Sequence, residues 1–426
     1  MRDRYSINVR GLVTAAALLV VLTMVPVLAH GKQPMSGQIV VDAEHPQWLR
    51  YHEGGPFYMA GPGDPEGFLY RGRLQASGTR RGDQKKLIRR LSKTGANSIY
   101  LMAVRSHGGD GDDTHNPYIG HNPANELNPK VLNQWEKWFK RMDRNGIVIF
   151  FIFYDDSARI WDTGDKVSPA ERSLFEQLVD RFEHHKHLIW VVAEEYQERY
   201  TAARISRIAA VIRKADDYDH PIAVHKLTGL TFDEFANDKN IDQFAIQYKP
   251  DSVEEVHEAM QVAWREAKGR YNINLAEVHP PVTGAAARKR AWAAAMSGAY
   301  VMAYEMDIAS TKANDMKDLG RLARFMESTD FFRMAPRDSL AMAETEYMLA
   351  KPGKSYIAYS SKGNGPLGVK NLKAGTYLLY WFDAVTGTEF EDMVELAAGD
   401  HRFPRPSGYG KEVALHLLRL DSEVVE

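Results

Sequence analysis

The stretch that most limits how this chain can fold runs from residue 187 to 196, HLIWVVAEEY. Residues 188–193 are apolar and rich in β-branched and aromatic types, which is typical of a strand buried on both faces of a parallel sheet. The run ends abruptly in Glu194 and Glu195. Because buried carboxylates are costly unless paired or solvated, we expect both glutamates at the carboxyl end of the strand, where an α/β barrel keeps its chemistry.

A second stretch has the same design. Residues 271–280, YNINLAEVHP, carry an apolar strand into Glu277. Similar runs alternate with segments of helical periodicity along the chain, and polar residues follow nearly all of them. The expected strands are 56–60, 97–104, 146–153, 188–193, 220–225, 242–248, 272–276 and 298–305. This alternation predicts a (β/α)8 barrel over residues 30–343, and the structural alternative is an open, doubly wound sheet.

The C-terminal part of the chain has a different sequence pattern. Helical periodicity is lost after Pro336. Strand-like runs follow at 356–359, 375–382 and 413–418. Short strands at regular spacing predict a small antiparallel β-sandwich, which we place at residues 344–426. We expect Tyr380, Trp381 or Phe382 to be partly buried between its layers.

Residues 1–29 have the features of a signal peptide. Arginines precede an apolar segment at 12–28, and Ala29 fits the small residue of a cleavage site. We therefore expect cleavage after Ala29 and export to the periplasm or the medium. The alternative is an uncleaved membrane anchor, since the apolar segment is near the lower length limit for a membrane span.

Composition removes several classes of function. The formal net charge is -2 with no basic excess, which argues against a nucleic-acid partner because phosphate binding needs concentrated positive charge. The chain has no cysteine, so disulfides, thiol catalysis and cysteine–zinc sites are excluded. Aromatic residues make up 11% of the chain, which suits stacking on sugar rings, although most of them will belong to the core.

Glu195 and Glu277 end the fourth and seventh expected strands, which a barrel brings to opposite sides of one pocket. Two such carboxylates are what glycoside cleavage requires. We expect Glu195 to be the general acid and base, with Glu194 as the alternative, and Glu277 to be the ionised nucleophile at a carboxyl separation of ~5–5.5 Å. The competing interpretation is structural, with a salt bridge from Glu195 to Arg199 or Arg204 and one from Glu277 to Lys226 or Lys249.

Other polar strand ends are expected around the same pocket, where planar hydrogen-bonding groups and aromatic rings would recognise a neutral sugar. This set comprises Asp64, Arg105, His107, Tyr154, Asp155, His225, Gln247, Tyr248, His279, Tyr304 and Glu305. For any single member, a hydrogen bond at the rim is the simpler interpretation. Asp155, His225 and His279 could form a metal site, but they lack a close-spaced ligand motif, so we expect no metal or other cofactor. The acidic loop 110–113 lacks the final glutamate of an EF-hand and is expected to be solvated.

Three further segments carry a family resemblance: the loop 105–110, RSHGGD, and the tail segments 356–359, YIAY, and 380–387, YWFDAVTG. With the glutamates that end strands four and seven, the chain resembles the clan of retaining glycosidases built on a (β/α)8 barrel. It also resembles a narrower group of exported bacterial glycosidases of the apiosidase type, whose C-terminal β-domain is named for collagen binding. That name is no physical argument, and we do not predict collagen binding.

The resemblance implies an exported glycoside hydrolase that acts on a poly- or oligosaccharide by a retaining two-glutamate mechanism. The clan has Asn before the acid/base Glu, where it holds the sugar 2-hydroxyl, whereas this chain has Glu194. A carboxylate there could accept a hydrogen bond but not donate one. The alternative is therefore a carbohydrate-binding or scaffold protein with a degenerate barrel. We expect no stable membrane insertion after cleavage, and the sequence leaves the sugar, the linkage and the oligomeric state open.

Overall fold

The computed structural model describes residues 32–63, 67–302 and 308–420. The expected signal peptide lies outside the described residues, as do Asp64, Tyr304 and Glu305. In the three described ranges, no helix is both long enough and apolar enough to cross a membrane.

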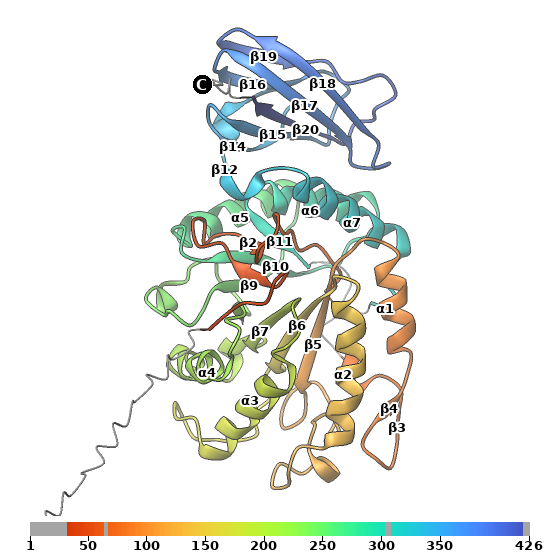
Figure 1. Cartoon of the computed structure of the whole chain (residues 1–426), viewed down its shortest axis with the longest axis vertical. Coiled ribbons are helices and arrows are strands. Elements are labelled where there is room, and N and C mark those ends of the chain that lie inside the picture. Colours follow the sequence, from red (N-terminus) through yellow and green to blue (C-terminus); the bar gives the residue numbers. More distant parts are fainter. Residues whose placement is uncertain (1–31, 64–66, 303–307, 421–426) are drawn as a thin grey trace, which may run out of the picture. The chain divides into compact units, whose positions relative to one another are not determined.

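A parallel sheet of seven strands forms the centre of the larger part of the chain, in the order β11-β10-β9-β8-β7-β6-β5 (Figure 1). The strands are β5 Ser98–Val104, β6 Val148–Tyr154, β7 Leu188–Ala193, β8 Ile222–Lys226, β9 Gln243–Tyr248, β10 Asn272–Val278 and β11 Ala299–Val301. Almost every residue in them is buried. Burial on both faces explains why these strands are continuous apolar runs in the sequence and do not alternate.

The segment 57–61 closes this sheet into a barrel by joining its two edges. The Gly61 N–H donates to the Val301 carbonyl at 3.0 Å, on the β11 side. On the other side, the Asn97 N–H donates to the Ala60 carbonyl at 2.9 Å, just before β5. The segment makes only an isolated parallel bridge, between Ala60 and Val301, so it is an irregular first strand. The predicted (β/α)8 barrel is confirmed.

Helices cover the outer face of the barrel, and Figure 1 shows α1 to α4 outside strands β5 to β7. They are α1 Gln84–Ser92, α2 Pro129–Asp143, α3 Pro169–Phe182, α4 Ala202–Ala215, α5 Val253–Glu266, α6 Ala285–Ala295 and α7 Ala313–Glu327. The start of α3 follows from local sequence, because the Ser168 side chain accepts the Glu171 N–H and Pro169 occupies the first turn.

Short elements connect these units. Two antiparallel pairs are β1 Ile39–Val41 with β2 Leu49–Tyr51, and β3 Arg73–Leu74 with β4 Arg80–Arg81. The 3-10 helices are η1 Phe68–Tyr70, η2 Ile119–His121, η3 Tyr196–Glu198, η4 Asp233–Phe235, η5 Phe331–Arg333 and η6 Asp338–Leu340. The long loop after β5 thus contains a turn of helix, η2.

Two antiparallel sheets form the C-terminal part. The larger has the order β12-β14-β15-β20-β17-β18 and the smaller the order β13-β16-β19. Their strands are β12 Ala335–Pro336, β13 Ala341–Ala343, β14 Tyr347–Lys351, β15 Ser355–Ser360, β16 Leu367–Leu372, β17 Gly375–Asp383, β18 Glu389–Leu396, β19 Gly399–Phe403 and β20 Val413–Arg419. The two sheets share an apolar core of their own, as the predicted antiparallel sandwich requires.

Side chains alternate along β17 between two environments. Trp381 belongs to the core between the two C-terminal sheets. Tyr380 and Phe382 instead pack on Phe325 of α7, with ring centroids 5.8 and 5.2 Å apart. All three side chains are buried. The period of two explains why a single aromatic run serves both the sandwich and its contact with the barrel.

Helix α6 is covered on both sides. Trp292 stacks on Tyr359 of β15, with centroids 4.7 Å apart and nearly parallel rings. The Arg288 guanidinium makes a bidentate pair with Glu412, donating from Nε at 2.8 Å and from Nη2 at 2.7 Å. These contacts join the barrel helix to the C-terminal sheets.

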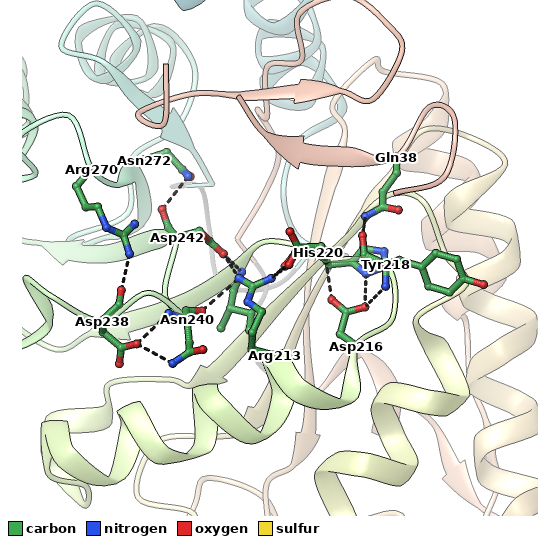
Figure 2. A network of polar contacts seen from close by, with 12 residues as sticks. Gln38, Arg213, Asp216, Tyr218, His220, Asp238, Asn240, Asp242, Arg270 and Asn272 are labelled. Atoms are coloured by element: carbon green, nitrogen blue, oxygen red, sulfur yellow. Dashed lines mark hydrogen bonds and ion pairs between the residues drawn. The ribbon is translucent and has the colours of Figure 1, made fainter. Parts of the chain in front are cut away.

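A polar network lies at the amino ends of strands β8 to β10 (Figure 2). Arg213 pairs with Asp242, whose carboxylate also accepts the Ile222 N–H at 2.9 Å. Asp216 accepts the His220 N–H at 2.7 Å and lies 3.0 Å from its ring Nδ1. Asp242 and Asp216 thus each have a nitrogen partner within the network. Such an end of a barrel serves stability, and the chemistry is expected at the carboxyl ends of the strands.

Candidate active site

The carboxyl ends of β5 to β10 bring polar side chains together into what we call the acidic cluster. Its members are Tyr100, Arg105, Asp155, Glu194, Glu195, His225, Gln247, Glu277 and His279. All but His279, which is half-buried, are buried. A carboxylate oxygen of Glu194, one of Glu277 and a ring nitrogen of His225 lie within 4.8 Å of one another. The ends of β7 and β10 therefore meet, as barrel geometry requires.

The turn after β7 explains why two consecutive glutamates both face this cluster. Neighbouring residues of a regular strand point to opposite faces of the sheet. Glu195 leaves that pattern with φ 37° and ψ 44°, in the left-handed region that non-glycine residues seldom adopt. Its N–H donates to Nδ1 of His225 at 3.2 Å, which helps to hold the turn. Strained backbone of this kind is found at functional sites.

A β-bulge explains how Glu277 reaches the cluster. Leu275 pairs with Ile246 of β9, but the next pair joins Glu277 with Gln247, so one residue is left over. In a regular strand Ala276 would lie opposite Gln247. The extra residue moves Glu277 into that position, on the face where Gln247 reaches the cluster. Bulges re-aim side chains in this way beside active sites.

Glu277 lies between two histidines. Nε2 of His279 is 2.6 Å from Oε1 of Glu277, and Nε2 of His225 is 3.9 Å from Oε2. The tautomer of His225 is fixed because a backbone N–H can only donate, so Nδ1 accepts from Glu195 and Nε2 carries the proton. Burial lowers the pKa of His225 to about 4, so the ring is neutral at pH 7. Its Nε2 is buried and has no hydrogen-bond partner among the described residues.

Glu195 is in a different environment from Glu277. Its Oε1 accepts a hydrogen bond from Nε2 of Gln247. Burial, and then the negative charge of Glu277, raise the pKa of Glu195 to about 8. A carboxyl group in this state holds its proton at neutral pH and can act as a general acid.

Glu194 and Asp155 form the inner part of the cluster. The Tyr100 hydroxyl donates to Oε1 of Glu194 at 3.1 Å. Nε of Arg105 donates to Oδ2 of Asp155 at 2.9 Å. Burial raises the pKa of Glu194 well above its usual range, and the charges of Asp155 and Glu277 raise it further. Sequence reasoning missed Tyr100, because a tyrosine inside the apolar strand 98–104, SIYLMAV, cannot be told from a core aromatic residue.

Other predicted site residues make their contacts elsewhere. The Tyr154 hydroxyl donates to Glu171 of α3 at 3.0 Å, and the Tyr248 hydroxyl donates to Glu255 of α5 at 3.1 Å. His107 is exposed, and its Nδ1 lies 2.7 Å from the hydroxyl of its neighbour Ser106.

The structural alternative for Glu277 gave it Lys226 as a salt-bridge partner. In the structure, Nζ of Lys226 donates to Glu234 and to the Thr231 carbonyl, the latter at 2.6 Å. The Lys226 ammonium is thus bonded to residues of the loop that follows β8. The close nitrogen neighbours of Glu277 are those of His225 and His279.

Three groups of the cluster, Glu194, His225 and Glu277, have the spacing of metal ligands. A metal-bound histidine usually donates its other ring N–H to an acceptor. Here the other nitrogen of His225, Nδ1, faces the Glu195 N–H, which is a donor. Nε2 therefore presents a proton where a metal would need a lone pair. The geometry suits a hydroxyl group better than a metal ion.

A hollow of about 620 Å³ lies beside the cluster. It is lined by residues 227–230 together with Gln247, Tyr248 and Lys249. Gln247 links the two regions, because it lines the hollow and also donates to Glu195. The hollow provides room for a group attached to whatever binds at the acidic cluster.

Solved structures that are similar to this chain include several glycoside hydrolases. A family 5 glycoside hydrolase from Bacteroides vulgatus is 13% identical, with a TM-score of 0.67 over 92% of this chain and 95% of that one. A second glycoside hydrolase from the same organism is 13% identical, with a TM-score of 0.65 over 90% and 83%. A family 5 mannosidase from Rhizomucor miehei is 13% identical, with a TM-score of 0.50 over 69% and 99%. At these identities the likeness shows the fold alone.

The profile of the apiosidase-like catalytic domain matches residues 76–307, more than half of the chain. The chain therefore belongs to the apiosidase-like family of glycoside hydrolases. The match ends before the C-terminal sheets. A comparison with curated proteins finds no match.

Proposed function

We propose that the protein is an exported glycoside hydrolase that cleaves a poly- or oligosaccharide with retention of anomeric configuration. Glu195 is the general acid and base, and Glu277 is the nucleophile. The observation that supports this assignment is the difference between their surroundings. The pKa of Glu195 is raised to about 8, so Glu195 keeps its proton at neutral pH. Glu277 has Nε2 of His279 at 2.6 Å from its Oε1, a contact that suits a carboxylate.

The reaction has two steps. In the first, the Glu277 carboxylate attacks the anomeric carbon, and Glu195 gives its proton to the departing glycosidic oxygen. In the second, the Glu195 carboxylate takes a proton from water as the water attacks the same carbon and releases Glu277.

The sugar at the point of cleavage is uncharged. Asp155, Glu194, Glu195 and Glu277 surround the site. The raised pKa values of Glu194 and Glu195 favour their uncharged forms, and Asp155 is paired with Arg105. The remaining negative charge is that of Glu277, and Coulomb repulsion between it and the carboxylate of a uronic acid disfavours such a sugar. Neutral hydroxyl groups find donors and acceptors here without that cost.

Hydrolysis of a panel of neutral aryl glycosides tests the proposal. Glu277→Gln should abolish turnover on every substrate that the wild type cleaves, because no other group can form the covalent intermediate. Glu195→Gln should spare the first step for good leaving groups, and azide should restore turnover by replacing the activated water. NMR of the first-formed product should show the retained anomer. An inverted product, or wild-type protein that binds sugars without cleaving any of them, would contradict the mechanism.

Export rests on the sequence of the first 29 residues, and it is tested separately. We expect the mature protein to begin at His30 and to be recovered from the periplasm or the medium. N-terminal sequencing of the recovered protein measures this. A chain that starts at Met1 in the membrane fraction would show an uncleaved anchor instead.

A further inference from the structure

Glu194 lies between other carboxyl groups and has no ion pair of its own among the described residues. Its oxygens come within 4.8 Å of those of Asp155 and Asp156 on one side and of Glu277 on the other. The nearby guanidinium, Arg105, is bonded to Asp155. The nearby imidazole, His225, is neutral at pH 7. This inner group therefore has fewer cations than carboxyl groups.

We propose that Glu194 is a positioning residue that works as an uncharged carboxylic acid, donating a hydrogen bond to Asp155, accepting one from Tyr100 and leaving the negative charge on Glu277. This proposal rests on the proposed function, in which Glu277 is the nucleophile. It assigns Glu194 a role distinct from that of Glu195, although the two are neighbours in the sequence.

Hydrogen-bond counting places the proton on Glu194. Two carboxyl groups can share a hydrogen bond only if one of them is protonated. Asp155 already receives Nε of Arg105 at 2.9 Å, the Asp110 N–H at 3.1 Å and the Asp156 N–H at 3.1 Å. These donors stabilise an ionised Asp155. Among the described residues, the hydrogen-bond donor that faces Glu194 is the neutral Tyr100 hydroxyl, so Glu194 is the better place for the proton.

The electrostatics agree with this assignment. Burial and the charges of Asp155 and Glu277 raise the pKa of Glu194 well above its usual range. Burial also raises the pKa of Asp155, but the charge of Arg105 and the hydrogen bonds with Glu194 and Arg105 offset part of that rise.

The groups that face Glu194 come from each neighbouring strand. They are Tyr100 on β5, Asp155 and Asp156 after β6, Glu195 after β7, His225 on β8 and Glu277 on β10. Ionisation of Glu194 would place a second charge within 4.8 Å of Glu277 and disturb the hydrogen bond to Asp155. A neutral acid, by contrast, has one donor and one acceptor, like a side-chain amide. It can fix Asp155 and Tyr100 without adding charge.

Substitution by an amide and by alanine tests this role. Gln at position 194 can still donate to Asp155 and accept from Tyr100, so Glu194→Gln should lower kcat by less than about tenfold. Glu194→Ala loses both contacts and should lower kcat by about 100-fold, as misplaced catalytic groups do. Glu391→Gln, an exposed change on β18, is the matched control. If Glu194→Gln were as inactive as Glu277→Gln, or if azide rescued it, the residue would need its charge or act as the acid/base, and the proposal would be wrong.

Infrared spectroscopy gives a readout that does not depend on hydrolysis. In a Glu195→Gln background at pH 7, the C=O stretch of a buried protonated carboxyl should remain. Its intensity should fall when Glu194→Gln is added, and the remainder is expected from Glu327, whose pKa burial raises to about 7. A band of unchanged intensity after Glu194→Gln is added would overturn the proposal even if the enzyme hydrolyses glycosides. Conversely, a normal band together with an active Glu277→Gln protein would overturn the proposed function while leaving the protonation of Glu194 intact.

Discussion

Glu195→Gln should stabilise the fold while it impairs catalysis, and the size of the effect follows from the acidic cluster. The pKa of Glu195 is raised from 4.5 to about 8 on folding. Each pKa unit corresponds to ~1.4 kcal/mol. At pH 7 the unfolded chain ionises this group and the folded chain keeps it protonated. Solvent at the rim of the cluster screens part of this effect. We therefore expect the raised pKa of Glu195 to lower the free energy of unfolding by roughly 2–3 kcal/mol at pH 7.

The sign of the pH dependence is fixed by the direction of the shift. Between pH 4.5 and about 8 the folded chain binds more protons at Glu195 than the unfolded chain does. The free energy of unfolding therefore falls as the pH rises through this window, and it levels off above it. Glutamine does not titrate, yet it keeps an oxygen that can accept from Gln247. Glu195→Gln should remove this part of the slope.

The assay is urea unfolding of the wild type and Glu195→Gln between pH 4.5 and 9, with Glu391→Gln as the exposed control. The two curves should nearly coincide at pH 4.5 and separate to roughly 2–3 kcal/mol at pH 7–8. The control should follow the wild type at every pH. Equal stability of Glu195→Gln and wild type across the range would refute the argument that burial holds a proton on Glu195.

Other predictions follow from single contacts. Gln247→Leu removes the hydrogen bond that lowers the pKa of Glu195, so the alkaline limb of the kcat/KM profile should move to higher pH; an unmoved limb would contradict this. Aryl uronides should be hydrolysed with kcat/KM about tenfold or more below matched neutral glycosides, because of the repulsion described above. Arg288→Met should cost ~3–5 kcal/mol by leaving the buried carboxylate of Glu412 unpaired, whereas Arg324→Met, in an exposed pair, should cost less than about 1 kcal/mol; thermal unfolding measures both.

The barrel was predictable because its strands are buried on both faces, which leaves unbroken apolar runs in the sequence. The order of strands and the placement of glutamates after the fourth and seventh follow from those runs and from barrel geometry. The first strand, 57–61, was also found as an apolar run, but its irregularity was not, because its pairing depends on distant partners at Val301 and Asn97.

The details of the acidic cluster depend on backbone irregularities that leave no mark in the pattern of side chains. In a regular strand Glu277 would share a face with Leu275, and only the bulge at Ala276 sends it to the other one. The left-handed turn at Glu195 likewise brings Glu194 and Glu195 into one site. A glutamate in the sequence does not predict that backbone conformation. Tyr154 was predicted in the site because it ends a strand. Its position in the sequence did not reveal that its hydroxyl donates to Glu171 of α3 instead.

The coverage of α6 has a consequence for how this protein can be divided. An exposed helix has a polar side, but α6 is largely alanine with Trp292 stacked against Tyr359 on the side away from the barrel. Removing the C-terminal sheets would uncover this surface and the Arg288 charge together. The sheets are therefore no detachable module: heating the mature chain should give one calorimetric transition for barrel and sheets, and a barrel cut off before β12 should aggregate.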